Sequence, residues 1–233
     1  MLVKDWMSRD VITVDASTSL QEAMKLLTEH NINMLPVMQD GKLVGVISDR
    51  DVKHAAPSEI TVIDVKQITY HFSRLDVRAI MSPNPITVPE DFTLEETAEI
   101  FLDNNISGCP VLSRKGELVG IITKSDLFTA LISATGMRKR GIRFGFLVED
   151  KPGSIQEVAD VLRSYGGKLA SIMTTYEGSF RGHRLVYIRV YHLDRTKLPQ
   201  ILRELKAMVK VLYWIDHHTG YREVYATYGE AYV

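Results

Sequence analysis

The chain has 233 residues, of which 45% are hydrophobic and 24% charged, so it is too apolar to be mostly disordered and long enough for two average domains. Its 28 Lys and Arg residues nearly balance 29 Asp and Glu, and the formal net charge of −1 excludes an overall field that would draw the chain to nucleic acid or to an anionic membrane. A single cysteine, Cys109, excludes an intrachain disulfide and a cysteine-based zinc site.

No segment has the pattern of a membrane span or a secretory signal. No apolar stretch approaches the roughly 18 residues that a spanning helix needs. The opening MLVKDWMSRD lacks the apolar core of a signal peptide. We therefore expect a soluble protein of the cytoplasm.

An internal repeat organises residues 7–127. Three segments return in the same order 74 or 75 residues later, which indicates a duplication. The paired segments are MSRDVITV (7–14) with MSPNPITV (81–88), NINMLPV (31–37) with NISGCPV (105–111), and GKLVGVISDRDV (41–52) with GELVGIITKSDL (116–127).

Each copy predicts the same series of elements. A short strand (11–14 and 86–88) leads to a helix that a capping box opens, Ser19 with Glu22 in the first copy and Thr93 with Glu96 in the second. Apolar residues at helical spacing predict the buried face of that helix. These residues are Leu20, Ala23, Met24, Leu27, Leu94, Ala98 and Phe101. An extended segment, a glycine turn, a Val- and Ile-rich strand and a second helix follow.

The second helix of each copy begins with a hydroxyl and, three residues later, a carboxylate: Ser48 with Asp51, and Thr123 with Asp126. A hydroxyl among the free N–H groups of a helix start suits a phosphate, and a carboxylate can accept hydrogen bonds from the two hydroxyls of a ribose. The alternative is that each pair is only a capping box. Two instances at matched positions after a buried strand favour a nucleotide site.

The sequence resembles the cystathionine-β-synthase (CBS) domain family. The resemblance rests on the G-h-h-[ST]-x-x-D motif (45–51 and 120–126), the N-I-x-x-x-P-V segments and the opening M-S-x-x-x-I-T-V. It implies a tandem pair, a Bateman module, which commonly binds AMP, ADP, ATP or S-adenosyl ligands. By this resemblance, Ser48 and Thr123 meet phosphate, and Asp51 and Asp126 meet ribose. The backbone that would wall the adenine lies at Ile12, Thr13, Pro36, Val37, Ile86, Thr87, Pro110 and Val111.

Residues 142–215 predict the order βαββαβ of the ferredoxin-like plan. The expected strands are 142–149, 168–176, 184–191 and 209–215, with one helix from Ser154 under a Ser154–Glu157 capping box and a second carrying Leu198, Ile201, Leu202 and Leu205. This part resembles the ACT domain, a regulatory module that often binds amino acids or dimerises. The resemblance implies that a ligand carboxylate docks at the turn formed by Asp150, Pro152, Gly153 and Ser154. The alternative is that these residues only make a tight turn and cap the helix.

The expected fold class is therefore α+β / α/β, a Bateman module followed by a ferredoxin-like ACT domain. We expect CBS domains at 1–75 (with a connector from about residue 53 and a turn at Pro57-Ser58) and 76–135. A hinge at 136–141 and an ACT domain at 142–233 follow. The order CBS–CBS–ACT resembles the bacterial acetoin-utilisation accessory proteins.

We expect a regulatory protein that is not an enzyme, has no catalytic cofactor or metal, and takes an adenine nucleotide as its regulatory ligand. An amino-acid ligand, a homodimer and an unidentified target protein are the further expected partners. The alternatives are a structural adaptor with empty clefts and a nucleotide-processing enzyme, against which stands the lack of a base–nucleophile pair.

Three other features have simpler explanations. Cys109, before Pro110, predicts a small buried thiol rather than a nucleophile. His217 and His218 have no further ligand at metal-site spacing and predict a solvated tail. Four tyrosines at helical spacing predict a stripe that docks on a partner chain or on the tail's own domain. They are Tyr221, Tyr225, Tyr228 and Tyr232.

Overall fold

The computed structural model describes residues 1–55 and 72–226. The chain divides into two compact units, Met1–Phe128 and Thr129–Val233. The predicted turn at Pro57-Ser58 lies outside the described residues. None of the helices in the described ranges combines the length and the hydropathy of a bilayer span.

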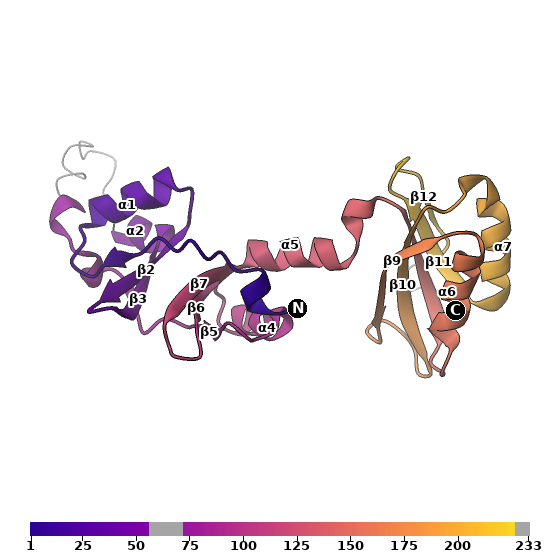
Figure 1. The fold of residues 1–233 in the computed structure, drawn as a ribbon, viewed down its shortest axis with the longest axis horizontal. Helices are drawn as coiled ribbons and strands as arrows, with labels where there is room; N and C mark the ends of the chain where they lie inside the picture. Colours follow the sequence, from indigo (N-terminus) through magenta and orange to yellow (C-terminus); the bar gives the residue numbers. More distant parts are fainter. Residues whose placement is uncertain (56–71, 227–233) are drawn as a thin grey trace. The chain divides into compact units, whose positions relative to one another are not determined.

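In the first unit, the first copy of the repeat folds as a small sheet with two helices (Figure 1). Strand β1 runs parallel to β2, and β2 runs antiparallel to β3. Apolar side chains of α1, β2 and β3 form its core together with side chains from residues 72–81. The elements are β1 (Val14–Asp15), α1 (Leu20–Glu29), β2 (Met34–Gln39), β3 (Lys42–Ser48) and α2 (Asp49–Ala55).

The second copy repeats this plan with the same register. Val88 of β5 pairs with Val111 of β6, as Val14 pairs with Val37 in the first copy. Strand β6 then runs antiparallel to β7. The elements are β4 (Ser82–Pro83), β5 (Val88–Pro89), α4 (Leu94–Asp103), β6 (Gly108–Leu112), β7 (Leu118–Thr123) and α5 (Lys124–Ala134).

The predicted helices of the repeat are present, whereas its first strands are shorter than predicted. Thr93 and Glu96 form a full capping box, and in the first copy Ser19 accepts only the N–H of Glu22, at 3.2 Å. The predicted strands 11–14 and 86–88 are wrong in extent, because only two residues pair in each copy. Upstream, the N–H of Val11 turns back to the Arg9 carbonyl at 2.9 Å, and Pro85 has no N–H to offer.

The opening segment of each copy packs on the other copy. The 3₁₀ helix η1 (Val3–Asp5) begins where the N–H of Val3 donates to the Phe92 carbonyl, just before α4, at 2.8 Å. Its counterpart η2 (Val77–Ala79) begins where the N–H of Val77 donates to the Thr18 carbonyl, just before α1, at 2.8 Å. Figure 1 shows the N-terminus beside α4.

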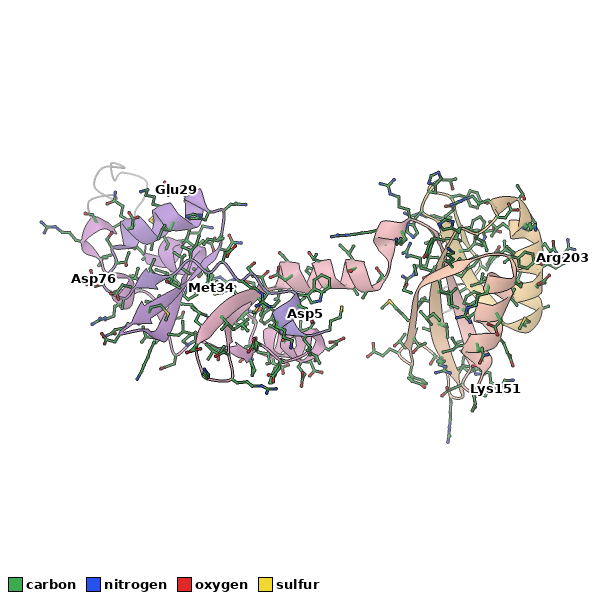
Figure 2. All side chains as sticks on the ribbon, in the orientation of Figure 1. Asp5, Glu29, Met34, Asp76, Lys151 and Arg203 are labelled. Atoms are coloured by element: carbon green, nitrogen blue, oxygen red, sulfur yellow. The ribbon has the colours of Figure 1, made fainter. Side chains whose placement is uncertain are left out.

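The exchange continues into the two sheets. The N–H of Ser8 donates to the Ile121 carbonyl at 2.9 Å, and Ile121 returns a bond at 3.0 Å. Strand β4 in turn pairs with β3 of the first copy. Figure 2 accordingly shows Asp5 beside the second copy and Asp76 in the first. Contacts therefore assign residues 1–8 to the second copy and residues 75–83 to the first.

The second unit is one antiparallel sheet, in the strand order β12-β11-β8-β10-β9, with α6 and α7 on one face (Figure 1). Its core lies between that face and the two helices. This confirms the predicted element order βαββαβ and adds β12. The elements are η3 (Met137–Lys139), β8 (Ile142–Glu149), α6 (Ser154–Ser164), β9 (Lys168–Thr175), β10 (His183–Tyr191), η4 (Arg195–Lys197), α7 (Leu198–Met208), β11 (Lys210–Asp216) and β12 (Arg222–Val224).

The predicted capping box of Ser154 with Glu157 is wrong. The N-cap is Gly153, in the left-handed region at φ 88°, so Ser154 is already the first helical residue. Its hydroxyl donates back to the Lys151 carbonyl at 2.9 Å and does not accept from the helix. The glycine turn thus starts the helix one residue earlier than the cap pattern indicates.

The predicted helical stripe of tyrosines is also wrong. Tyr221 directly precedes β12 and Tyr225 directly follows it, and this strand forms a hairpin with β11. The N–H of Tyr225 donates to the Leu212 carbonyl at 2.8 Å, which extends the pairing. Tyr228 and Tyr232 lie outside the described residues.

The segment expected as a hinge packs on the sheet of the second unit. The Thr135 carbonyl accepts hydrogen bonds from Ser171 Oγ and from Arg189 Nε, both at 2.8 Å. Gly141 leaves no space for a side chain, because a Cβ there would overlap the Val190 carbonyl oxygen. These contacts hold residues 135–141 as part of the second unit rather than as a free linker.

Candidate functional site

The two predicted hydroxyl–carboxylate pairs have the same geometry. Asp51 Oδ2 accepts from Ser48 Oγ at 2.6 Å and from the Ser48 N–H at 2.8 Å. Asp126 Oδ2 accepts from Thr123 Oγ1 at 2.6 Å and from the Thr123 N–H at 2.8 Å. In both copies the carboxylate residue's own N–H points back at the hydroxyl oxygen, at 3.4 Å. Each pair is therefore a reciprocal cap at the junction of a buried strand and a helix.

The cap uses one oxygen of each carboxylate and leaves the other available. Within the described residues, Oδ1 of Asp51 and Oδ1 of Asp126 accept no hydrogen bond. The hydroxyl proton of Ser48 or Thr123 is committed to the carboxylate, so it cannot be donated to a phosphate at the same time. The hydroxyl orients the carboxylate, and Oδ1 is the atom that remains for a ligand.

The structure brings the other predicted positions of each copy close to this junction. In the first copy, β2 lies between β1 and β3: Val37 pairs with Val14 of β1, and Met34 pairs with Ser48 of β3. In the second copy, Val111 pairs with Val88, and Gly108 with Thr123. The two pairings are three residues apart along the central strand in both copies, which is about 10 Å. Both copies thus present the same set of groups at the same spacing.

The predicted wall positions differ in exposure. Four of them are buried in the central strands, so their side chains are not available to a ligand: Pro36, Val37, Pro110 and Val111. Thr13 is exposed, Ile12 and Thr87 are half-buried, and Ile86 is 38% exposed. The side chains that can contact a ring are therefore those just before β1 and β5.

The sequence reasoning missed why each motif begins with glycine. A Cβ on Gly120 would lie 2.9 Å from Met7 Cγ and closer still to Met7 Sδ. A Cβ on Gly45 would lie 3.1 Å from Met81 Cγ and closer to its Sδ. Each glycine makes room for the methionine of the exchanged segment, and the only sequence signal is that both copies have this methionine and this glycine.

The part of the chain that contains this repeat is similar to known proteins. The family model described as "CBS domain" matches residues 3–58 and 77–133. A CBS domain-containing protein of Dictyostelium discoideum is 36% identical over 133 residues, which is 57% of this chain and 92% of that protein. The chain belongs to the CBS domain family.

Two further known proteins are similar to this part of the chain. Inosine-5′-monophosphate dehydrogenase of Korarchaeum cryptofilum (strain OPF8) is 38% identical over 120 residues, 52% of this chain but only 22% of that enzyme. A crystal structure of the CBS domain pair of protein MJ0100, in complex with 5′-methylthioadenosine and S-adenosyl-L-methionine, is 34% identical. It covers 56% of this chain and 95% of the other, with a TM-score of 0.47.

The predicted amino-acid turn, in the second unit beyond the CBS pair, already has internal partners. Asp150 Oδ1 lies 3.4 Å from Arg184 Nε, and Ser154 Oγ donates to the Lys151 carbonyl. The N–H of Glu157 donates to the Gly153 carbonyl at 3.0 Å. Pro152 and Gly153 form the turn, and Gly153 is exposed to solvent.

The remaining candidate residues, Cys109 and His217, both have buried side-chain atoms. Cys109 is 1% exposed, and burial raises the pKa of its thiol to about 12, which confirms a buried thiol. The solvated tail predicted at His217 is wrong: its N–H donates to the Gly141 carbonyl at 3.2 Å, and its Nε2 is buried. Among the described residues no group of three or more His, Cys, Asp or Glu could hold a metal ion.

Proposed function

We propose that this chain is a regulatory protein, not an enzyme, whose CBS pair binds an adenine nucleotide or an S-adenosyl ligand. The observation that carries the proposal is the identical hydroxyl–carboxylate cap in both copies, each with an Oδ1 to which no described residue donates a hydrogen bond. A cap alone needs no carboxylate, because Ser or Thr already caps a helix. A second oxygen held in a fixed direction at two matched positions suits a pair of ribose hydroxyls.

The proposed contacts follow from this geometry. Oδ1 of Asp51 or Asp126 accepts hydrogen bonds from the ribose hydroxyls. The central strands at Pro36-Val37 and Pro110-Val111 wall the adenine, and the side chains just before β1 and β5 contact its ring. Ser48 and Thr123 act on the carboxylate rather than on phosphate, which revises the role expected from the family resemblance.

Binding measurements on single variants test the proposal. Asp51→Ala and Asp126→Ala each remove a charge-assisted bond of roughly 1.5–3 kcal/mol, and we expect nucleotide affinity to fall tenfold or more in the occupied copy. Titration calorimetry with AMP, ATP and S-adenosylmethionine measures it. Asp49→Ala is the matched control on the same helix, since the Asp49 carboxylate forms an ion pair with Lys53 at 2.8 Å. Unchanged affinity in the double variant would exclude the ribose contact, and no binding at all would favour an adaptor with empty clefts.

We further propose that the second unit is an ACT domain, which supports a role for the chain like that of the acetoin-utilisation accessory proteins. The βαββαβ order and the glycine turn before α6 support this assignment. Because the turn's side chains already have partners, dimerisation is the role we favour over amino-acid binding. Sedimentation of the full chain with and without a mixture of amino acids tests both roles, and a monomer unaffected by amino acids would contradict them.

A further inference from the structure

One end of the sheet in the second unit collects basic side chains on the face away from α6 and α7. Arg189 of β10 pairs with Arg143 of β8, which pairs with Ile215 of β11, which pairs with Arg222 of β12. Directly paired residues project to the same face, and His217 follows Ile215 by two residues. We call Arg143, Arg189, Arg222 and His217 the basic cluster.

Alternation along the strands fixes which face this is. Ile142 and Phe144 flank Arg143, and Ile188 and Val190 flank Arg189. All four of these flanking residues belong to the core beneath the two helices. The basic cluster therefore lies on the opposite face of the sheet, away from α6 and α7.

Two buried nitrogen atoms of the basic cluster have no hydrogen-bond partner among the described residues: Arg189 Nη1 and His217 Nε2. Arg189 is only 2% exposed, and its Nε donates to the Thr135 carbonyl at 2.8 Å. Leaving a buried donor without an acceptor costs more free energy than a typical hydrogen bond contributes. A buried guanidinium adds the cost of an unpaired charge. Such a group calls for an acceptor.

No carboxylate of the described chain supplies that acceptor. Asp216, next to His217, is held by Arg195 at 2.6 and 3.1 Å, and Glu223 accepts from Trp214 Nε1 at 2.9 Å. Burial, and then the neighbouring Arg143, lower the pKa of Arg189.

The imidazole of His217 is affected in the same way. Burial, and then Arg189, Arg222 and Arg143, lower its pKa, and Asp216 opposes them. At neutral pH the three arginines thus repel one another and keep the His217 imidazole uncharged, and a bound negative charge would relieve this repulsion.

We propose that the basic cluster is a binding site for an oxyanion, the carboxylate or phosphate group of a small molecule. Arg222 is exposed and Arg143 half-buried, so the anion approaches from the side of β12 and engages Arg189 and His217 behind them. The site is separate from the CBS pair. It is also separate from the turn at Asp150, because Arg143 and Asp150 are seven residues apart along β8, about 23 Å.

Arg189 also has a structural role that has to be distinguished from this one. Its Nε donates to the carbonyl that follows α5, where a cation stabilises the helix C-terminus. That role accounts for Nε alone. It explains neither the unpaired Nη1 nor the three other basic residues on the same face.

The test uses the full chain with Trp6→Phe, so that Trp214 reports the second unit, at low ionic strength. Sodium phosphate and sodium acetate are compared with sodium chloride at matched ionic strength. We expect a saturable rise of several degrees in the unfolding midpoint with an oxyanion and not with chloride. A rise with both anions identifies a carboxylate-tolerant site, and a rise with phosphate alone a phosphate site. Equal effects of all three salts would overturn the proposal.

Variants separate the basic cluster from other cations. Arg189→Met is expected to weaken anion binding at least tenfold. Arg143→Gln is the second variant in case the first does not fold. Arg203 is an exposed cation on α7 (Figure 2), and Arg203→Met is the matched control, which should keep the rise in the unfolding midpoint. Asp51→Ala/Asp126→Ala also keeps it, which separates this site from the proposed nucleotide site. A direct readout is the imidazole of His217, whose pKa rises when an anion binds. If Arg189 only caps α5, that pKa does not respond to phosphate.

Discussion

Single side chains show how much the local environment changes ordinary chemistry in this protein. Cys109 lies in β6 at 1% exposure, beside Pro110 and opposite Ile122. Desolvation raises the pKa of its thiol to about 12, so the reactive thiolate is almost absent at neutral pH. The residue contributes apolar packing to the second copy of the repeat.

We expect the folded protein to resist alkylation at Cys109. At pH 7.5, iodoacetamide should label the native chain at least a hundredfold more slowly than the chain in denaturant, as followed by mass spectrometry. Because the chain has one cysteine, the urea-unfolded sample is its own control. Equal labelling rates in the two samples would contradict the burial of this thiol.

The pair of Asp216 with Arg195 is a second residue whose environment matters. The Arg195 hydrogen bonds lower the pKa of Asp216 from 3.8 to about 2, and the carboxylate is 5% exposed. A lowered pKa stabilises the fold at pH values above the unfolded pKa. That stability is lost as pH falls from about 4 through about 2.

We therefore expect Asp216→Asn to cost on the order of 1–2 kcal/mol of unfolding free energy at pH 7, discounted for the partly exposed arginine. The variant should also lose less stability than the wild type between pH 4 and 2. Urea unfolding followed through Trp214 measures both effects. Asp160→Asn, which breaks the exposed pair with Arg163, is the control and should change little. Parallel acid limbs for Asp216→Asn and wild type would contradict the assignment.

At the level of elements, the close contact of Gly120 with Met7 joins a strand of the second copy to the chain's first turn. A Cβ at Gly120 would crowd Met7 Cγ and Sδ and would lie 3.0 Å from the Ser8 carbonyl. We expect Gly120→Ala to destabilise the first unit by about 1–3 kcal/mol, since crowding a packed contact costs that much.

A double-mutant cycle tests the origin of that cost. Gly120→Ala should couple with Met7→Ala by about 0.5 kcal/mol or more, since the shorter side chain gives the new methyl group space. It should not couple with Met81→Ala, which faces Gly45 instead. Coupling to Met81 rather than to Met7 would show that the opening segments are not exchanged.

The sequence predicted most elements because their signals are local. The duplicated segments, the caps at Ser48 and Thr123, and each element of the order βαββαβ can be recognised from a few consecutive residues. The exchange of opening segments could not be predicted, because a repeat shift of 74 residues is the same whichever copy a segment packs on. The stripe of Tyr221 and Tyr225 misled because two residues four positions apart can also flank a three-residue strand. The Arg189 environment depends on strand pairing between distant segments, which composition does not reveal.

For the whole molecule, the two units have separate cores and one tryptophan each, Trp6 and Trp214. We expect an adenine ligand at a hundred times its dissociation constant to add about 2.7 kcal/mol to the unfolding of the first unit alone. Trp214→Phe then reports the stabilised unit and Trp6→Phe the other. Equal shifts of both signals would contradict separate unfolding, and a shift seen only through Trp214 would contradict the proposed ligand site.

The exchange of residues 1–8 with residues 75–83 also bears on how such a chain can arise. One repeat taken alone has its glycine strand and its methionine segment, but the segment does not pack on its own strand. Two separate copies would satisfy each other as an intertwined dimer, in the manner of a domain swap. Fusing two such genes would turn that dimer into a single chain without changing a contact. The half-length ancestor, if rebuilt from either repeat, is then expected to be an obligate pair of subunits.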